Sequence, residues 1–208
     1  MVVRVVSVNV GAPRATQWRG RTVHSAIWKT PVDGPIRVAG VNLAGDDQAD
    51  RRVHGGVDKA VYAYSAEDYA WWADTGGVAV GPASFGENLT TTGIDLRACA
   101  VGDRWRVGTV ELEVAQPREP CFKLGIRMGD DAFPDRFAEA RRPGAYFRII
   151  TEGELAAGDA VEVTPSAQPS VALGDMVRGP SDAQWRIMRD DERFPPLWRH
   201  RAERALRL

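Results

Sequence analysis

A cysteine in a charged, proline-containing stretch is the side chain in this sequence best suited to do chemistry. The stretch QPREPCFKLG, residues 116–125, places Cys121 between Arg118 and Lys123. Positive charges close to a thiol help keep it deprotonated, and the thiolate is the form that attacks electrophiles and ligates metals. Two prolines just before the cysteine fix backbone φ angles and limit where the thiol can point. Cys121 is therefore predicted to be a metal ligand or a nucleophile, with an inert small hydrophobic residue as the alternative.

Other metal-binding and nucleotide-binding patterns have little support in the sequence. The two cysteines and three histidines form no CxxC and no HxxxH, which argues against a zinc site with about four ligands. No Walker-type loop and no GxGxxG is present, so an ordinary nucleotide site is not indicated. A thiol hydrolase built on Cys121 with His54 as its base stays open, because the sequence does not show whether the two residues meet. Cys99, in LRACAVG, is expected to be structural.

Composition indicates one globular domain, with enough residues for a small appendage. The chain has 208 residues, of which 44% are hydrophobic and 26% charged, and it can bury a core without disulfide bonds. A net charge of -1 gives no global electrostatic reason to expect nucleic acid or a membrane surface as partner. No stretch approaches the roughly 18 apolar residues of a membrane span, and the first residues lack a secretory pattern. We expect a cytoplasmic protein with reduced thiols.

Short runs of β-forming residues separated by Gly, Pro and Asp dominate the chain. GDRWRV at 102–107 and GDAVEV at 158–163 each place a Gly-Asp turn before an alternating strand, as in a closed sheet. Gly108-Thr109 fits a type II′ hairpin turn. Helices are expected after Ser65, after Ser181 and in the basic segment LWRHRAERALRL. The predicted strands are 2–10, 23–29, 60–64, 105–107, 110–114, 146–150 and 160–163.

Four segments in this order resemble the MOSC superfamily, named after the C-terminal domain of molybdenum cofactor sulfurase. They are HGGVDKAVYAYSAEDYAWW (54–72), FGENLTTTGI (85–94), VGDRWRVGTVELEVAQPREPCFKL (101–124) and GAYFRII (144–150). The resemblance implies a mainly β fold with some α, a MOSC-type β-barrel with peripheral helices and a small C-terminal helical extension. We place the barrel domain at residues 1–165 and the helical extension at 166–208.

The resemblance also implies the molybdenum cofactor, a molybdopterin, with Cys121 as catalytic residue and metal ligand. A soft thiolate suits a metal already held by the cofactor's dithiolene sulfurs, so one protein ligand is enough. Cationic and glycine residues are expected to bind the anionic pterin, and an amide to meet its polar edge. The alternatives are a solvated face for the arginines, a brace at the Gly-Gly turn for His54 and a loop tether for Asn88. The candidate cofactor-binding residues are Cys121, Arg118, His54, Gly55, Gly56, Lys59, Asn88, Lys123, Arg51, Arg148 and Lys29, with Arg52 beside them.

The function implied by the resemblance is a two-electron reduction of N-hydroxylated compounds, such as hydroxylaminopurine-type bases. No flavin, haem or iron–sulfur signature is present, since a cluster would need about four cysteines, so we expect an external electron-donor protein. A non-catalytic molybdenum cofactor carrier and a sulfur-transfer module are the alternatives. We expect a small-molecule substrate and no nucleic acid or membrane partner, and the oligomeric state stays open.

Overall fold

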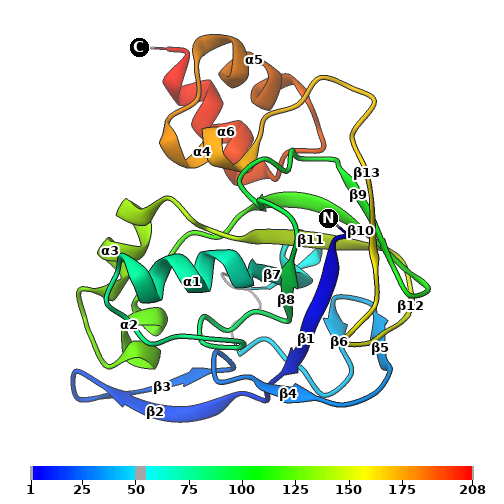
Figure 1. Cartoon of the computed structure of the whole chain (residues 1–208). Helices are drawn as coiled ribbons and strands as arrows, with labels where there is room; N and C mark the ends of the chain where they lie inside the picture. The colour runs from blue at the N-terminus through cyan, green and yellow to red at the C-terminus, as the bar shows by residue number, and fades with distance from the viewer. Residues whose placement is uncertain (1, 50–54, 208) are drawn as a thin grey trace.

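A mixed eight-stranded sheet forms the centre of the molecule in the computed structural model, which describes residues 2–49 and 55–207 (Figure 1). The strand order is β13-β9-β10-β11-β7-β8-β1-β4, and neighbours are antiparallel except for the parallel pair β7 and β8. The strands of this sheet are β1 (Arg4–Val10), β4 (Thr30–Val32), β7 (Val61–Ser65), β8 (Leu89–Thr92), β9 (Arg104–Val107), β10 (Val110–Pro117), β11 (Ala145–Thr151) and β13 (Val161–Thr164).

The predicted closed barrel is not confirmed. Within the described residues the two edge strands, β13 and β4, are not paired with each other. An isolated antiparallel bridge joins Arg4 to Ala160, and the Val161 amide donates to the Val3 carbonyl at 2.9 Å. These contacts bring the beginning of β1 to the beginning of β13 without forming a ladder, whereas β4 pairs with β1 only along Val8–Val10. The fold is therefore sheet-dominated, with six α-helices around the described sheet.

Two smaller sheets flank the main one. The first has the order β12-β5-β6, and the second is a hairpin of β2 and β3. The predicted strand 23–29 is shorter than expected, because the chain leaves the hairpin after Ser25 and turns into the next segment. These strands are β2 (Arg14–Trp18), β3 (Arg21–Ser25), β5 (Ile36–Ala39), β6 (Asn42–Leu43) and β12 (Gly153–Leu155).

The hairpin of β9 and β10 has the two-residue connection that its sequence predicts. Val107 pairs with Val110, so Gly108 and Thr109 form the turn. Gly108 has φ +56° and Thr109 is not among the residues with positive φ, as a type II′ turn requires. A Cβ atom at Gly108 would also lie 2.4 Å from the Glu154 carbonyl oxygen, so glycine is needed for space as well.

Two helix starts agree with their sequence signals. The Ser65 hydroxyl accepts from the Asp68 amide at the start of α1 (Ala66–Asp74). Ser181 and Gln184 form a complete capping box at the start of α5 (Asp182–Asp190). Both signals depend on residues three apart in the chain, which makes them readable before the fold is known.

Two helices outside the predicted C-terminal helical extension were not predicted, and one of them begins at the cysteine. The sequence signals predict no helix after Cys121, but the segment forms α2 (Phe122–Met128) with Cys121 as its N-cap. Cys121 makes no side-chain cap hydrogen bond and Gly125 lies inside the helix, so ordinary helix signals are weak. The second is α3 (Phe133–Ala140), which packs against α2.

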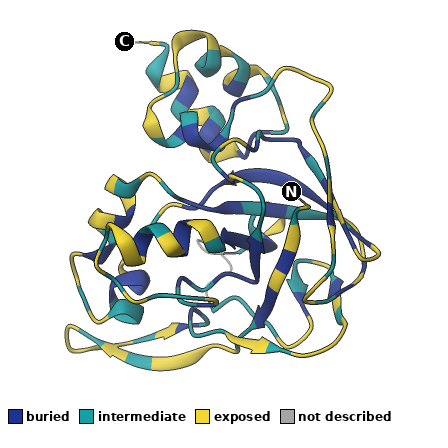
Figure 2. Ribbon diagram, in the orientation of Figure 1, coloured by how far each residue is buried: buried dark blue, intermediate teal, exposed yellow. Residues whose placement is uncertain are grey.

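The core has two parts, and the C-terminal helices share one of them with the sheet (Figure 2). Met188, Trp198 and Ala202 are buried together with sheet residues such as Trp105. The second part is aromatic and lies under α1, α2 and α3. The C-terminal helices are α4 (Leu173–Arg178), α5 and α6 (Pro196–Ala205), and they follow the end of β13 at Thr164. The domain boundary at 165–166 stays a prediction.

Candidate functional site

A pocket opens beside the N-terminal end of α2 and brings together several of the residues chosen from the sequence. It contains about 690 Å³ of empty space, its open mouth included. Residues far apart in the chain line it, from Ser25 at the end of β3 to Tyr146 in β11. The predicted site residues in its lining are Lys29, Lys59, Asn88, Arg118, Cys121 and Lys123.

Cys121 presents a free, half-buried thiol to this pocket. Its backbone is extended, at φ -139° and ψ 169°, and its carbonyl oxygen accepts from the Leu124 amide at 2.9 Å. Cys99 differs from Cys121 in burial and in position. It is buried and does not line the pocket, and burial raises the pKa of its thiol to about 12. Of the two thiols, only that of Cys121 is placed to meet a ligand.

Arg118 is a buried cation without a carboxylate partner in the described part of the chain. Arg118 is 7% exposed. Its Nη1 atom is fully buried and donates no hydrogen bond to any described residue. The guanidinium lies over the rings of Tyr62 and Phe137, with its carbon 5.1 and 5.5 Å from their centroids. Burial lowers the pKa of Arg118, but the hydroxyls of Tyr62 and Tyr146 outweigh burial and the pKa rises above its usual value. A buried guanidinium of this kind is suited to an anion.

A second part of the pocket wall is organised by Asp46, which the sequence signals did not reveal. Its carboxylate forms an ion pair with Lys29, and the two side chains are only 4% and 8% exposed. It also accepts from the Gly11 amide and from the Asn88 side-chain nitrogen, both at 2.8 Å. Burial lowers the pKa of Lys29, although the charge of Asp46 opposes this effect. The charges on this wall are thus balanced within the protein.

Asn88 uses its side chain to join three segments. Its Oδ1 accepts from the Tyr62 amide at 3.1 Å, and its Nδ2 donates to Asp46 and to the Asn9 carbonyl oxygen. Asn88 is 4% exposed. These contacts hold β7, β8 and β1 together at the pocket floor, which favours the tether among the roles considered for Asn88.

Lys59 and Lys123 complete the positive side of the pocket. Burial lowers the pKa of Lys59, with Glu119 as the largest opposing influence. Lys123 is 9% exposed on α2. The lining holds four cations and three carboxylates, the latter being Asp46, Asp47 and Glu119.

The remaining predicted residues lie elsewhere or outside the described residues. Gly55 and Gly56 precede a short 3-10 helix, Val57–Lys59, and are not part of the pocket lining. Arg51, Arg52 and His54 lie outside the described residues, so their placement relative to Cys121 stays a prediction.

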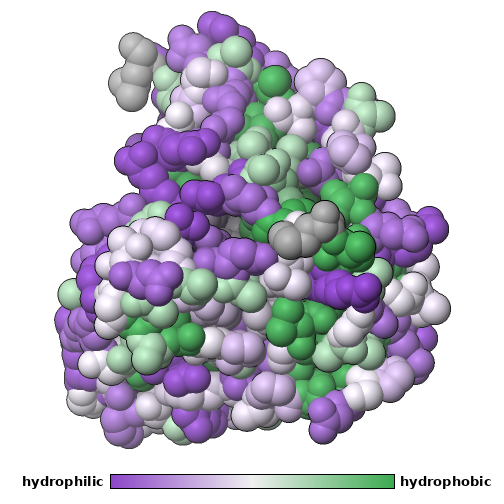
Figure 3. All heavy atoms as spheres, viewed as in Figure 1, coloured by the Kyte–Doolittle hydropathy of each residue, from purple (hydrophilic) through white to green (hydrophobic). Residues whose placement is uncertain are grey.

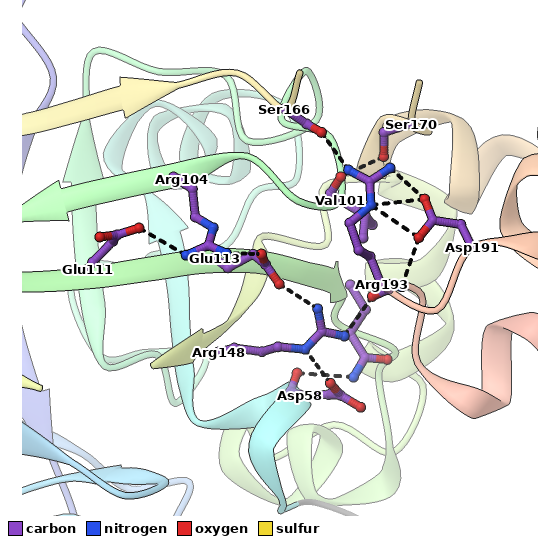
Figure 4. Close-up of polar contacts among 11 residues, drawn as sticks. Asp58, Val101, Arg104, Glu111, Glu113, Arg148, Ser166, Ser170, Asp191 and Arg193 are labelled. Atoms are coloured by element: carbon purple, nitrogen blue, oxygen red, sulfur yellow. Dashed lines mark hydrogen bonds and ion pairs between the residues drawn. The ribbon is translucent and has the colours of Figure 1, made fainter. Parts of the chain in front are cut away.

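Arg148 is not brought to the pocket. Figure 4 shows its guanidinium between Asp58 and Glu113, with contacts of 2.6 and 2.7 Å. Its third contact, also 2.6 Å, is to the carbonyl oxygen of Arg193, which follows α5. Arg148 therefore links the main sheet to the C-terminal region, a contact across 45 residues that the sequence could not show.

Tyr62 and Tyr146 were also missed as pocket residues, and both are adjacent to Arg118. Tyr62 donates from its hydroxyl to the Pro143 carbonyl at 2.9 Å. Burial raises the pKa of both tyrosines, so both hydroxyls stay neutral near neutral pH. Both tyrosines lie in strand-forming runs, which predict a structural role only. The alternation of apolar and polar residues along a strand does not distinguish a side chain that lines a pocket from one in the core.

The donor set suits a metal-bearing organic anion better than a bare metal ion. In the described part of the chain, no cluster of three or more His, Cys, Asp or Glu residues could hold a metal ion. One soft thiolate ligand is sufficient only for a metal that brings other ligands with it. The buried, partnerless Nη1 of Arg118 supplies a donor for the anionic part of such a group.

No helix in the described residues is long and apolar enough to cross a bilayer.

Comparisons of this chain with a family profile and with individual proteins agree with one another. The profile of the MOSC domain family matches residues 50–162, more than half of the chain. The protein YflK of Bacillus subtilis is 32% identical over 169 residues, covering 81% of this chain and 76% of that protein. The protein YiiM of Escherichia coli is 31% identical over 177 residues, covering 83% and 76%.

A third protein is similar in sequence, and one solved structure is similar in fold along nearly the whole chain. A Gibberella moniliformis protein named a reductase is 32% identical over 170 residues, which cover 76% of this chain but 29% of that longer protein. The crystal structure of YiiM from Geobacillus stearothermophilus has a TM-score of 0.79 and 26% identity, covering 98% of this chain and 99% of that one.

Proposed function

We propose, from the premise that this chain belongs to the MOSC domain family, that the Cys121 pocket binds the molybdenum cofactor. The single observation that carries the proposal is the pairing of an accessible thiol with a buried guanidinium that has an unbonded nitrogen, in one pocket. Cys121 would be the protein's ligand to the metal, and Arg118 would bind an anionic group of the pterin. Lys59 and Lys123 add positive charge at the same side.

We further propose that the protein reduces N-hydroxylated compounds, with hydroxylaminopurine-type bases as substrates. The net reaction converts R–NHOH to R–NH₂ and water and consumes two electrons and two protons. The bound cofactor would supply the two-electron redox chemistry. The chain's own residues hold the thiolate, neutralise the cofactor's charge and line a pocket that limits access of water. Electrons are proposed to come from an external donor protein in the cytoplasm.

Reduction of hydroxylaminopurine with a chemical electron donor tests this proposal directly. The wild-type protein, made in a host that synthesises the cofactor, is expected to form adenine, and Cys121→Ser is expected to lose at least about 100-fold in kcat, because the metal loses its protein ligand. Cys99→Ser is the matched control, since it removes the other thiol and leaves the pocket intact. Full activity of Cys121→Ser would refute the role of Cys121, whereas bound molybdenum without turnover would support a cofactor carrier.

A further inference from the structure

A second hollow lies on the other side of the segment that carries Cys121. It runs between α3 and the C-terminal helices, and contains about 1080 Å³ of empty space including its opening. Figure 3 shows hydrophilic residues on the left of the constriction between the helical lobe and the sheet, and hydrophobic residues toward its right. We call this hollow the interhelical groove. Arg118 and Glu119 line both the groove and the Cys121 pocket, so one short segment separates the two.

The groove has more arginine than carboxylate side chains in its lining. Five arginines and one carboxylate line it. Three of the arginines have carboxylate partners, because Arg142 pairs with Asp68, Arg178 with Asp175 and Arg201 with Glu119. Among the described residues, Arg118 and Arg141 form no ion pair. An excess of arginine over carboxylate, with arginine's fork-shaped donors, is the composition of an anion site.

Aromatic side chains form the apolar part of the groove. Phe137, Trp185 and Trp198 line it from α3, α5 and α6. The guanidinium of Arg201 lies 4.7 Å from the Trp198 ring centroid, so cationic and aromatic surfaces adjoin. Phe137 and Trp198 are only 1% and 4% exposed, so the half-buried Trp185 is the ring best placed to contact a planar ligand beside the guanidinium groups.

Arg141 is held in a backbone conformation that arginine disfavours. It ends α3 with φ +52° and ψ 37°, in the left-handed region where glycine is usual. Its side chain is exposed and lines the groove. Strained positions of this kind occur at ligand sites, where a side chain has a use that offsets its backbone cost.

We propose that the interhelical groove binds the nucleotide form of the substrate, with its phosphate on Arg141 and Arg178 and its ring against Trp185. The substrate class would then be N-hydroxylated nucleoside phosphates rather than free bases. This deepens the proposed function and depends on it for the chemistry, while binding in the groove can be tested without any reaction. Arg118 lines both the groove and the Cys121 pocket, so a ligand in the groove lies one short segment away from Cys121.

Calorimetric titration of the full chain with adenosine 5′-monophosphate, an unreactive analogue, tests the binding site. We expect the monophosphate to bind more tightly than either adenosine or inorganic phosphate. Arg141→Gly should weaken its binding about tenfold or more, because a charge-assisted contact to phosphate is lost. Glycine suits the left-handed backbone, so this variant is not expected to unfold. Arg186→Ala, which removes an exposed arginine of α5 outside the groove, is the control and should bind like wild type.

Two results would overturn the groove site. One is equal affinity of Arg141→Gly and wild type for the monophosphate, provided that Arg178→Gln also has no effect. The other is loss of monophosphate binding when the protein is loaded with molybdenum cofactor, which would assign the groove to the cofactor's own phosphate.

Steady-state reduction then separates the two proposals. Arg141→Gly is expected to raise KM for hydroxylaminopurine nucleotide about tenfold and to leave KM for the free base unchanged. If neither substrate is reduced although the monophosphate binds as expected, the proposed reaction fails and the groove stands. If both are reduced and the variant changes neither KM, the groove proposal is wrong and the reaction stands.

Discussion

The two walls of the Cys121 pocket both carry buried cations, but they differ in how those charges are balanced. On one wall, Lys29 pairs with Asp46, and Asp46 is also bonded to Asn88. On the other, Arg118 is nearly as buried and has no carboxylate partner among the described residues. The first wall is complete in the free protein, whereas the second gains an anionic partner only from a ligand. Charge balance thus separates the part of the pocket that maintains the fold from the part suited to binding.

Removing the charge of Asp46 should have the largest effect on stability. Asp46→Asn is expected to lower the free energy of unfolding by about 3 kcal/mol, because Lys29 would be left buried without a counter-charge. Urea-induced unfolding measures this. Asp95→Asn is a matched control at a more exposed ion pair with Arg97 and should cost less than about 1 kcal/mol. Equal effects of the two variants would contradict the role given to Asp46.

The pH dependence of stability should reveal Lys29. Its folded-state pKa lies below 10.5 because of burial, although Asp46 opposes the shift. Between that pKa and 10.5, the unfolded chain binds more protons than the folded chain, so the free energy of unfolding rises with pH from this group. Lys29→Met should remove the Lys29 contribution and so reduce the rise in urea series taken toward alkaline pH, while the contribution of Lys59, whose pKa is also lowered by burial, stays. If the free energy of unfolding changed with pH equally in Lys29→Met and wild type, Lys29 would have the same pKa in the folded and unfolded chains.

Removing the charge of Arg118 should affect stability far less than removing that of Asp46. Arg118→Met is expected to change the free energy of unfolding by less than about 1 kcal/mol, because the lost contacts with aromatic rings are offset by removal of an unpaired buried charge. The same variant should retain little molybdenum. Chemical unfolding and elemental analysis of one preparation give both readouts. A loss as large as that of Asp46→Asn would indicate that the charge of Arg118 is balanced within the protein.

The smallest effect is expected at the ion pair between Arg201 and Glu119, which joins α6 to the cysteine-bearing segment. Its side chains are 37% and 47% exposed, so Arg201→Ala should cost less than about 1 kcal/mol. Thermal unfolding of Arg201→Ala, compared with the control Arg204→Ala on the same helix, measures this loss of stability. A larger loss would mean that this exposed pair, rather than buried Trp198, holds the helix.

Local signals in the sequence were sufficient for much of the fold. The caps at Ser65 and Ser181 and the turn at Gly108 each depend on residues within a few positions of one another. The start of α2 was missed because Cys121 is a poor cap and Gly125 a poor helix former. Gly125 is needed there for space, since a Cβ atom would lie 2.9 Å from the Asp130 carbonyl oxygen.

The candidate site was predictable only in part, for a related reason. Cys121, Arg118 and Lys123 adjoin in the chain, so their charge pattern was visible. Asp46 contacts Asn88 across 42 residues, and no local pattern records such a contact. Arg148 shows the converse error, because a cation in a family motif was taken for a ligand when its partners are carboxylates elsewhere in the fold.

The molybdenum content of the purified protein, measured by elemental analysis, tests the central claim most directly. Wild-type protein and Cys99→Ala, made in a host that synthesises the cofactor, should each carry close to one molybdenum atom per chain, and Cys121→Ala should carry little. Wild-type protein without molybdenum, or equal metal content in Cys121→Ala and Cys99→Ala, would contradict the assignment of the Cys121 pocket as the cofactor site.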